Sequence, residues 1–236
     1  MPEGPEIYIM IQQLQRFAGA TLQRIQLNKG RYVRHGFQCH LILPIKIRHI
    51  RHHGKMIWME LAHDQVIIIS LGLTGSLYSK PPPLSTANLE FKTNRGTIYM
   101  EDPRNFGTVQ CGTMQRLKEK LVRLGPDVMQ ASISGLRIRD TYEKVVGRTP
   151  NKTIAELLLD QRIYAGPGNY IRSEGLYNLH IHPKTKIKHI SYPLYRRLIL
   201  CIRRIMKQIV RGTYQLKIYR QPHAKWITLH HRRIYY

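Results

Sequence analysis

The chain opens with the hexapeptide MPEGPE, which combines an amine with carboxylates in a way that could do chemistry. Methionine before a small residue is normally removed, and this would leave Pro2 with a free secondary amine. An α-amino group has a pKa near ~8, against ~10.4 for lysine, so a useful fraction is uncharged at neutral pH. An uncharged amine can form an imine with a sugar aldehyde carbon, and Glu3 beside it could move protons. The same hexapeptide could equally be a polar lead-in to a helix.

A second candidate site lies in residues 161–174, where a turn with Gly166, Pro167 and Gly168 separates two helical segments. Glycine lets a backbone approach a ligand closely. The helix that begins at Asn169 presents free N–H groups and the positive end of its dipole, and both favour phosphate. The pattern predicts a helix–turn–helix that clamps phosphate without reading bases. An ordinary helix hairpin, in which glycine and proline only break helices, is the alternative.

Two further motifs are ambiguous when taken alone. Arg104 and Phe106 lie two residues apart after a predicted strand, so they could wedge together into a duplex and fill the space left by an extruded base. A β-turn with a core phenylalanine and a surface arginine is favoured by these residues alone. Lys55 follows Gly54 at the start of a strand and could bind phosphate or act as a second amine. Its residue type alone favours a solvated side chain.

Charge narrows the class of partner. The 236 residues contain 38 Lys+Arg against 14 Asp+Glu, a formal net charge of +24, spread over the whole length. Such a charge is costly without a polyanionic partner, and nucleic acid is the usual one. A membrane surface is the rival, but no apolar run approaches the ~18 residues of a spanning helix. The N-terminus also lacks the pattern of a signal peptide. We therefore expect no membrane partner and an intracellular location at the genome.

The three cysteines, Cys39, Cys111 and Cys201, are far apart and form no CxxC pair. A sparse, odd-numbered set is typical of a reducing compartment. We expect no disulfide framework, and each cysteine to be a small buried apolar residue.

The hydrophobic pattern predicts an α+β fold. Short alternating or β-branched runs between turn residues indicate an antiparallel sandwich that follows an N-terminal helix, and helical periodicity dominates from Met114 onward. We expect a β-sandwich domain (1–125), a helical domain (126–212) and a terminal hairpin or zinc-finger-like element (213–236). The expected strands are Thr21–Leu27, Ile45–Arg51, Met56–Leu61, Val66–Leu71, Leu89–Lys92, Thr97–Met100 and Thr108–Cys111, and the expected helices are Pro5–Phe17, Gln115–Leu124, Lys152–Gln161, Asn169–Leu179 and Pro193–Arg211.

Together these motifs resemble the formamidopyrimidine-DNA glycosylase/endonuclease VIII family of base-excision repair enzymes, over nearly the whole chain. Their order and spacing make coincidence a poor explanation. The motifs that carry the resemblance are PEGPE at 2–6, GK at 54–55, LGLTGS at 71–76, DPRxFG at 102–107, LGPD at 124–127, DQ at 160–161 with GxGNYI at 166–171, Glu174, and IHP at 181–183.

The resemblance implies a bifunctional DNA glycosylase/AP lyase that needs no cofactor for catalysis. Pro2 would attack C1′ of a damaged nucleoside and form a Schiff base, Glu3 would protonate the opened sugar, and Glu6 would support the site. Lys55 would contact phosphate and assist strand cleavage by β,δ-elimination. The remaining roles belong to DNA binding: Leu73, Arg104 and Phe106 would fill the void of the flipped base, Gly168 and Asn169 would hold the phosphate beside the lesion, and Arg232 would grip the lesion phosphates.

Two departures from the family pattern favour the endonuclease VIII branch. Leucine occupies position 73, where the purine-specific branch has methionine. Residues 211–216 are too short for the loop that covers oxidised guanine in that branch. We therefore expect oxidised pyrimidines, hydantoins and abasic sites as substrates, in duplex or in single-stranded DNA, and a monomeric enzyme.

The tail is a third departure. Members of the family usually end in a four-ligand zinc finger or in a zincless hairpin of the same shape. Here His223 alone lies where a ligand is expected, and the tail has no cysteine; one histidine cannot hold zinc. Either the tail is zincless, or further ligands lie beyond Tyr236. A non-catalytic protein that binds damaged or bent DNA is the alternative function, but it leaves the joint presence of Pro2, Glu3 and Lys55 unexplained.

Overall fold

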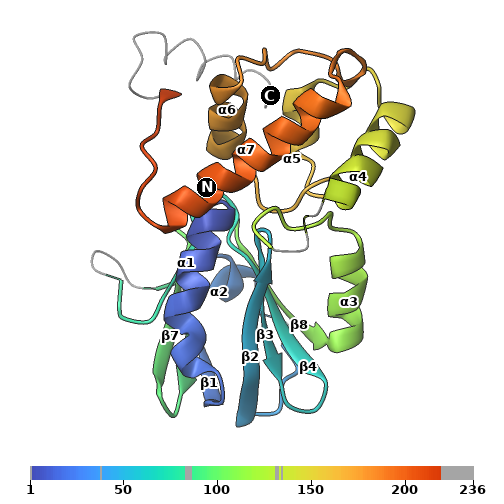
Figure 1. Cartoon of the computed structure of the whole chain (residues 1–236). Coiled ribbons are helices and arrows are strands. Elements are labelled where there is room, and N and C mark those ends of the chain that lie inside the picture. The colour runs from blue at the N-terminus through green and yellow to red at the C-terminus, as the bar shows by residue number, and fades with distance from the viewer. Residues whose placement is uncertain (1, 38, 83–86, 131–132, 134, 219–236) are drawn as a thin grey trace. The chain divides into compact units, whose positions relative to one another are not determined.

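The computed structural model describes residues 2–37, 39–82, 87–130, 133 and 135–218. The chain divides between Arg123 and Leu124 into two compact units, which we describe separately (Figure 1). The predicted third domain, 213–236, lies mostly outside the described residues, so the three-domain division stays a prediction. No helix among the described residues is long and apolar enough to cross a membrane.

The N-terminal unit is built on two antiparallel four-stranded layers joined at one corner. The corner is the short pairing of β1 (Thr21–Leu27) with β2 (Ile45–His53), in which Thr21 is opposite Lys46 and Leu22 is opposite Ile45. A sandwich of this kind confirms the predicted fold class. In sheet order the first layer holds β5 (Ser76–Tyr78), β7 (Gly96–Glu101), β6 (Leu89–Thr93) and β1 (Thr21–Leu27), and the second holds β2 (Ile45–His53), β3 (Met56–Leu61), β4 (Gln65–Ser70) and β8 (Thr108–Thr113).

Alternation along the strands produces the core between these layers. In β2 the isoleucines Ile45, Ile47 and Ile50 are buried, whereas Lys46 and Arg48 are exposed. The step from Ile47 to Ile50 breaks strict alternation, because the register with β3 shifts at a bulge between Ile47 and His49. The core residues contributed by the strands and by α1 (Gly4–Leu14) form one apolar cluster.

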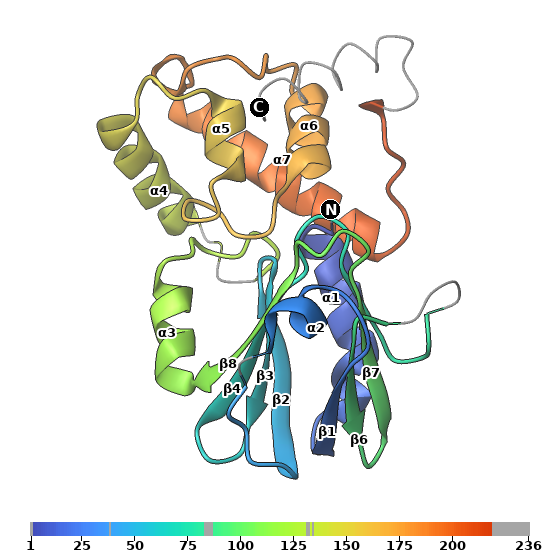
Figure 2. The ribbon, with the colours of Figure 1, turned by 180° about the vertical axis from the view of Figure 1, so that it is seen from behind.

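Helix α1 lies along this unit (Figures 1 and 2) and presents one apolar face to the core. Ile7, Ile11 and Leu14 are buried on that face, spaced by three and four residues as a helix requires. The 3-10 turn η1 (Gln15–Phe17) continues α1, and its Phe17 is also buried. A second helix, α3 (Met114–Val122), packs through Leu117 on the outer face of the second layer; its N-cap Thr113 accepts a hydrogen bond from the Arg116 N–H.

The C-terminal unit is helical. Its helices are α4 (Gly135–Arg148), α5 (Ile154–Leu159), α6 (Asn169–Asn178) and α7 (Tyr192–Val210), with the 3-10 turn η2 (Ile187–His189) (Figure 2). They share one apolar cluster. Helices α6 and α7 approach closely at Gly175, where an added Cβ would lie 2.6 Å from Cγ1 of Ile202. Thr153 and Glu156 form a capping box that starts α5.

All seven predicted strands and all five predicted helices are present, with ends that differ by up to a few residues. Among the described residues, four elements were not predicted: β5, α4, the one-turn helix α2 (Arg31–His35) and the 3-10 turn η2. Strand β5 has only three residues. Helix α4 buries few apolar side chains, Ile138 and Val145 among them, so its periodicity is weak.

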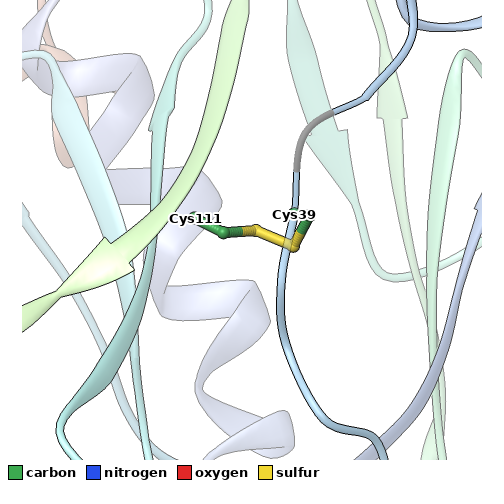
Figure 3. Close-up of a disulfide and its surroundings, with 2 residues drawn as sticks. All are labelled: Cys39 and Cys111. Atoms are coloured by element: carbon green, nitrogen blue, oxygen red, sulfur yellow. A yellow bond between two sulfur atoms is a disulfide. The ribbon is translucent and has the colours of Figure 1, made fainter.

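The prediction of no disulfide is wrong. Cys39, in the segment after α2, is bonded to Cys111 of β8 (Figure 3). Their sequence separation of 72 leaves no spacing signal in the sequence; tertiary structure brings them together. Cys201 is a free cysteine and only partly buried.

Candidate active site and phosphate clamp

The start of α1 fixes two of the predicted catalytic residues. Glu3 is the N-cap, and it forms a capping box with Glu6, whose Oε2 accepts a hydrogen bond from the Glu3 N–H at 2.9 Å. The Glu3 side chain is only 1% exposed. Carboxylates are favoured here because the helix N-terminus carries partial positive charge. Pro2, one residue before the cap, is partly exposed. The sequence that looked like a possible polar lead-in therefore forms a buried, ordered helix start.

Lys55 reaches the same place from the β2–β3 hairpin. The hairpin turns at Gly54, whose φ of 56° suits glycine. Two contacts hold the end of β2 against α1 and its continuation η1. The rings of Tyr8 in α1 and His52 meet edge to face at 5.9 Å, and Nε2 of Gln15 in η1 donates to the Ile50 carbonyl at 2.9 Å. The turn, and Lys55 with it, is thereby positioned by α1.

The ammonium group of Lys55 is partly desolvated and lies within the influence of two carboxylates. Burial lowers the pKa of its ammonium group, and the negative charges of Glu3 and Glu6 oppose this by raising it. The solvated side chain favoured by residue type alone is therefore incorrect. Pro2, a buried carboxylate and a partly desolvated lysine lie at one end of α1. Once Met1 is removed, Pro2 would carry a free amine, and this set of groups would suit imine formation and proton transfer.

The residues predicted to wedge into DNA lie on two neighbouring loops of the same unit. In residues 102–107, Asn105 has a φ of 56°, and Arg104 stacks with its guanidinium carbon 5.0 Å from the centre of the Phe106 ring. Phe106 is 51% exposed, which rules out a core phenylalanine at this position. The other loop, residues 71–75, carries a partly buried Leu73 and closes with a hydrogen bond from the Gly75 N–H to the Leu71 carbonyl at 2.9 Å.

The predicted phosphate clamp belongs to the helical unit. Between α5 and α6 the side chain of Gln161 shapes the turn: its Nε2 donates to the Pro167 carbonyl at 2.8 Å and its Oε1 accepts from the Gly166 N–H at 3.0 Å. Gly168 is the N-cap of α6, and Asn169 is exposed on its first turn. Backbone N–H groups at such a helix start, beside an exposed amide, can bind a phosphate.

A segment of the LGPD motif supports this turn. The Gly125 N–H donates to the Gln161 carbonyl at 2.8 Å, and the Ala165 N–H donates to the Pro126 carbonyl at 3.0 Å. A Cβ at Gly125 would lie 2.4 Å from the backbone of Ile163, so this approach requires glycine. The motif is thus a backbone support for the clamp.

Glu174 was identified in the sequence only as part of a family motif, with no role assigned to it. Glu174 on α6 is fully buried, and its carboxylate accepts from the Tyr214 hydroxyl at 2.6 Å and from the backbone N–H groups of Lys217 and Ile218, both at 3.1 Å. It therefore anchors the chain that leaves α7. The Tyr214 hydroxyl has a raised pKa, first through burial and then through this hydrogen bond. No periodicity or spacing rule would have found these partners.

Two predicted residues, His223 and Arg232, lie outside the described residues. Within the described part of the chain, no group of three or more His, Cys, Asp or Glu side chains is arranged to hold a metal ion.

Comparison with known proteins agrees with this geometry. The family model "Formamidopyrimidine-DNA glycosylase N-terminal domain" matches residues 1–109, and "Formamidopyrimidine-DNA glycosylase H2TH domain" matches residues 124–219. The two matches cover both units and most of the chain. The chain belongs to the formamidopyrimidine-DNA glycosylase/endonuclease VIII family, whose members are DNA glycosylases of base-excision repair.

Individual relatives are distant. The chain is 28% identical over 232 residues to formamidopyrimidine-DNA glycosylase of Thermus thermophilus, covering 94% of this chain and 82% of that one. It is 25% identical to the protein of the same name from Solibacter usitatus over 213 residues, 89% of this chain and 77% of that one.

Solved structures show the same fold. The MutM (Fpg) protein of Thermus thermophilus superposes with a TM-score of 0.75 at 24% identity, covering 90% of this chain and 77% of that one. The Lactococcus lactis Fpg, solved with DNA that contains an oxidised pyrimidine, gives a TM-score of 0.77 at 24% identity, covering 91% and 82%.

Proposed function

We propose that the protein is a bifunctional DNA glycosylase/AP lyase that excises oxidised bases through a Schiff base on Pro2 and then nicks the strand. The observation that carries the proposal is the gathering of Pro2, buried Glu3 and partly desolvated Lys55 at the start of α1. A protein that only bound damaged DNA would need the wedge and the clamp, but not this set of groups.

The residues of this site suit each step of the reaction. The Pro2 amine attacks C1′, the C1′–base bond breaks and the base departs. The amine nitrogen loses its proton and then forms a double bond to C1′, giving a positively charged imine (an iminium ion), as the sugar ring opens and Glu3 protonates the ring oxygen. The imine acidifies the C2′ proton; its removal forms a double bond as the 3′ phosphate leaves, and a second elimination releases the 5′ phosphate. In this scheme Lys55 contacts the phosphate and aids both eliminations, and Glu6 holds Glu3 in place.

We further propose that DNA is the partner and that a single chain acts at the genome. A net charge of +24 favours a polyanion. The exposed Arg104–Phe106 stack, together with Leu73, would fill the space of the extruded nucleotide, and Gly168 and Asn169 would hold an adjacent phosphate. One solved relative, the Lactococcus lactis Fpg, is described in complexes with abasic-site DNA and with oxidised-pyrimidine DNA. That is a property of that protein, and it makes DNA the first partner to test.

The proposed substrates are oxidised pyrimidines, hydantoins and abasic sites, although the relatives cited above bear the name formamidopyrimidine-DNA glycosylase. Leu73 replaces the methionine of the purine-specific branch. The segment after α7 supports the proposal as well: by Lys217 and Ile218 the backbone is already bonded to Glu174, which leaves little chain for a covering loop. Thymine glycol, a hydantoin and oxidised guanine opposite cytosine, offered in parallel, would test it, and preference for oxidised guanine would contradict it.

No step of this scheme passes through a metal. A structural zinc needs four ligands, and the described residues offer no cluster for one. Residues 213–236 contain no cysteine, so these residues by themselves do not supply the four ligands of a zinc finger. His223 and Arg232 remain predictions for that segment.

Borohydride trapping tests the mechanism directly. With lesion-containing duplex and sodium borohydride, the protein freed of Met1 should become covalently attached to the DNA, because the reductant fixes the imine. Pro2→Gly should lose most of the adduct. If the wild type forms no adduct but still binds lesion DNA tightly, the alternative of a non-catalytic damage-binding protein is correct. An uncleaved tag before Pro2 should also abolish trapping.

A further inference from the structure

We propose that Asp102 and Thr74 form a bridge that holds the 71–75 loop and the 102–107 loop together, so that Leu73 and the Arg104–Phe106 stack enter DNA as one preformed wedge. The inference deepens the proposed function, on which it rests. Asp102 and Thr74 are positioning residues: they act through the wedge side chains and do not touch the reacting sugar.

The carboxylate of Asp102 contacts both loops. Its Oδ1 accepts a hydrogen bond from the Thr74 hydroxyl at 3.2 Å, and its Oδ2 accepts from the Gly107 N–H at 2.6 Å. Thr74 adjoins Leu73, and Gly107 adjoins Phe106. Asp102 itself is only 3% exposed. A buried carboxylate with a donor from each loop fixes the distance between them, and hydrogen bonds to a charged group are the stronger kind.

The two loops also touch through their backbones. Gly72 has a φ of 60°, and a Cβ placed on it would lie 2.7 Å from the carbonyl carbon of Phe106 and 2.9 Å from the Gly107 nitrogen. Glycine is required here for two reasons: its backbone has a positive φ, and a Cβ would collide with the Phe106 backbone. The loops are therefore in contact on one side of Leu73, at Gly72, and bridged on the other, at Thr74.

The side-chain amide of Asn88 also holds the 102–107 loop in place. Asn88 is 3% exposed; its Oδ1 accepts from the Asp102 N–H at 2.7 Å, and its Nδ2 donates to the Asp102 carbonyl at 3.2 Å and to Asn105 Oδ1 at 3.1 Å. Asn105 Oδ1 also accepts from the Arg31 N–H at 3.3 Å. Asn105, whose left-handed backbone lies between Arg104 and Phe106, is thus held through its side chain by the Asn88 amide and the Arg31 backbone N–H.

A rigid pair of loops matters because the three wedge side chains must replace the extruded base together. If the loops moved independently, ordering them on the DNA would oppose insertion, whereas a preorganised wedge avoids that cost. Base extrusion, and not DNA affinity or imine chemistry, is therefore the step that the bridge should control.

The test uses Thr74→Val, which keeps the side-chain shape and removes the bridging hydroxyl. Thr74→Ser restores the hydroxyl. Thr97→Val is the matched control, because Thr97 lies at the end of β7 that pairs with Lys92, away from both loops. Each variant is mixed with a duplex that carries a stable abasic-site analogue opposite 2-aminopurine, whose fluorescence follows filling of the void. Excision from a lesion duplex, DNA affinity and melting temperature are measured in parallel.

We expect Thr74→Val to slow the fluorescence change and excision by about tenfold, the size expected for a lost hydrogen bond to a charged group. Affinity and melting temperature should stay close to wild type, Thr74→Ser should recover most of the rate, and Thr97→Val should behave as wild type. Asp102→Asn should slow the same step further. A wild-type rate for Thr74→Val, no recovery with serine, or no fluorescence change in the wild type would overturn the inference.

This outcome is separable from failure of the proposed function. If the fluorescence change occurs and slows as expected but borohydride traps no adduct, the bridge stands and the catalytic proposal fails. If borohydride traps the wild type and Thr74→Val fills the void at the wild-type rate, the catalytic proposal stands and the bridge fails.

Discussion

Each unit buries one glutamate almost completely, and the two differ in what surrounds them. Glu3 lies at a helix start, where its capping-box partner is Glu6 and the ammonium of Lys55 interacts with its charge. Glu174 lies within a helix and accepts hydrogen bonds from the Tyr214 hydroxyl and two backbone N–H groups. Burial alone therefore does not identify a catalytic carboxylate. A neighbouring amine indicates chemistry, whereas backbone N–H donors from a distant segment indicate a structural anchor.

Replacing each glutamate in turn by glutamine is the strongest test of the proposed difference between a catalytic Glu3 and a structural Glu174. Glu3→Gln should lower single-turnover excision by about 10²–10⁴-fold, the usual contribution of a positioned acid or base, because glutamine can still cap the helix but cannot supply a proton. DNA binding should persist. Quenched-flow excision assays on lesion duplex would measure this, with Glu174→Gln as the matched buried control. Unchanged excision in Glu3→Gln would remove Glu3 from the mechanism.

Loss of the disulfide should strongly lower the stability of the N-terminal unit, which contains both of its cysteines. Cys39→Ser should lower the free energy of unfolding by ~4 kcal/mol, because the crosslink closes a long loop, with a sequence separation of 72, in the unfolded chain. Urea unfolding under oxidising conditions would measure this. Cys201→Ser is the control, since that cysteine is free, and a dithiol reductant should destabilise wild type by the same amount as Cys39→Ser. Equal stability of oxidised and reduced wild type would contradict the expectation.

Glu174→Gln should act on stability where Glu3→Gln acts on chemistry. Replacing a buried carboxylate that accepts three hydrogen bonds should lower the unfolding free energy by about 2–3 kcal/mol. Part of the loss should recover in Glu174→Gln/Tyr214→Phe, which removes the unmatched hydroxyl. Denaturation followed by circular dichroism measures the change, and borohydride trapping at saturating DNA should remain. A trapping defect as large as that of Glu3→Gln would erase the distinction between the two carboxylates.

The smallest expected effect is a shift in pH dependence. Below its pKa, Lys55 is protonated and can contact phosphate; as pH rises through that pKa, the charge is lost. Because burial lowers this pKa from the ordinary lysine value of 10.5, kcat/KM should begin to fall at a lower pH than an ordinary lysine would give. Lys55→Arg keeps its charge to higher pH, so its alkaline limb should move upward even if its maximum rate is reduced. An unmoved alkaline limb would mean that another group titrates there.

The sequence predicted elements well where local periodicity is strong. The alternation of buried and exposed residues from Ile45 to Arg48 in β2, and the three-and-four spacing of the buried apolar residues in α1, identify these elements without tertiary information. Strand β5 is too short to show a period, and α4 has an apolar face too sparse to stand out from its charged residues. The Cys39–Cys111 disulfide joins two residues that are far apart in the sequence, so only the tertiary fold brings them together.

The candidate site shows the same limit. The types and order of residues identified Pro2 and Glu3 as candidates, but residue type alone favoured a solvated Lys55. The structure differs because the β2–β3 hairpin packs on α1 and brings its turn to the carboxylates. Likewise Phe106 by itself suggested a core residue, and only the packing of its loop leaves it exposed.

The capping box of Glu3 and Glu6 has a consequence for motion. The first turn of a helix is ordinarily where fraying begins, yet here that turn holds the groups proposed to react. Opening of this one helical turn would therefore separate the proposed catalytic groups from one another while the rest of the sandwich remained folded. Exchange of the Glu3 and Glu6 amide protons with solvent reports such opening, so their protection factors measure how much of the time the enzyme is assembled for reaction.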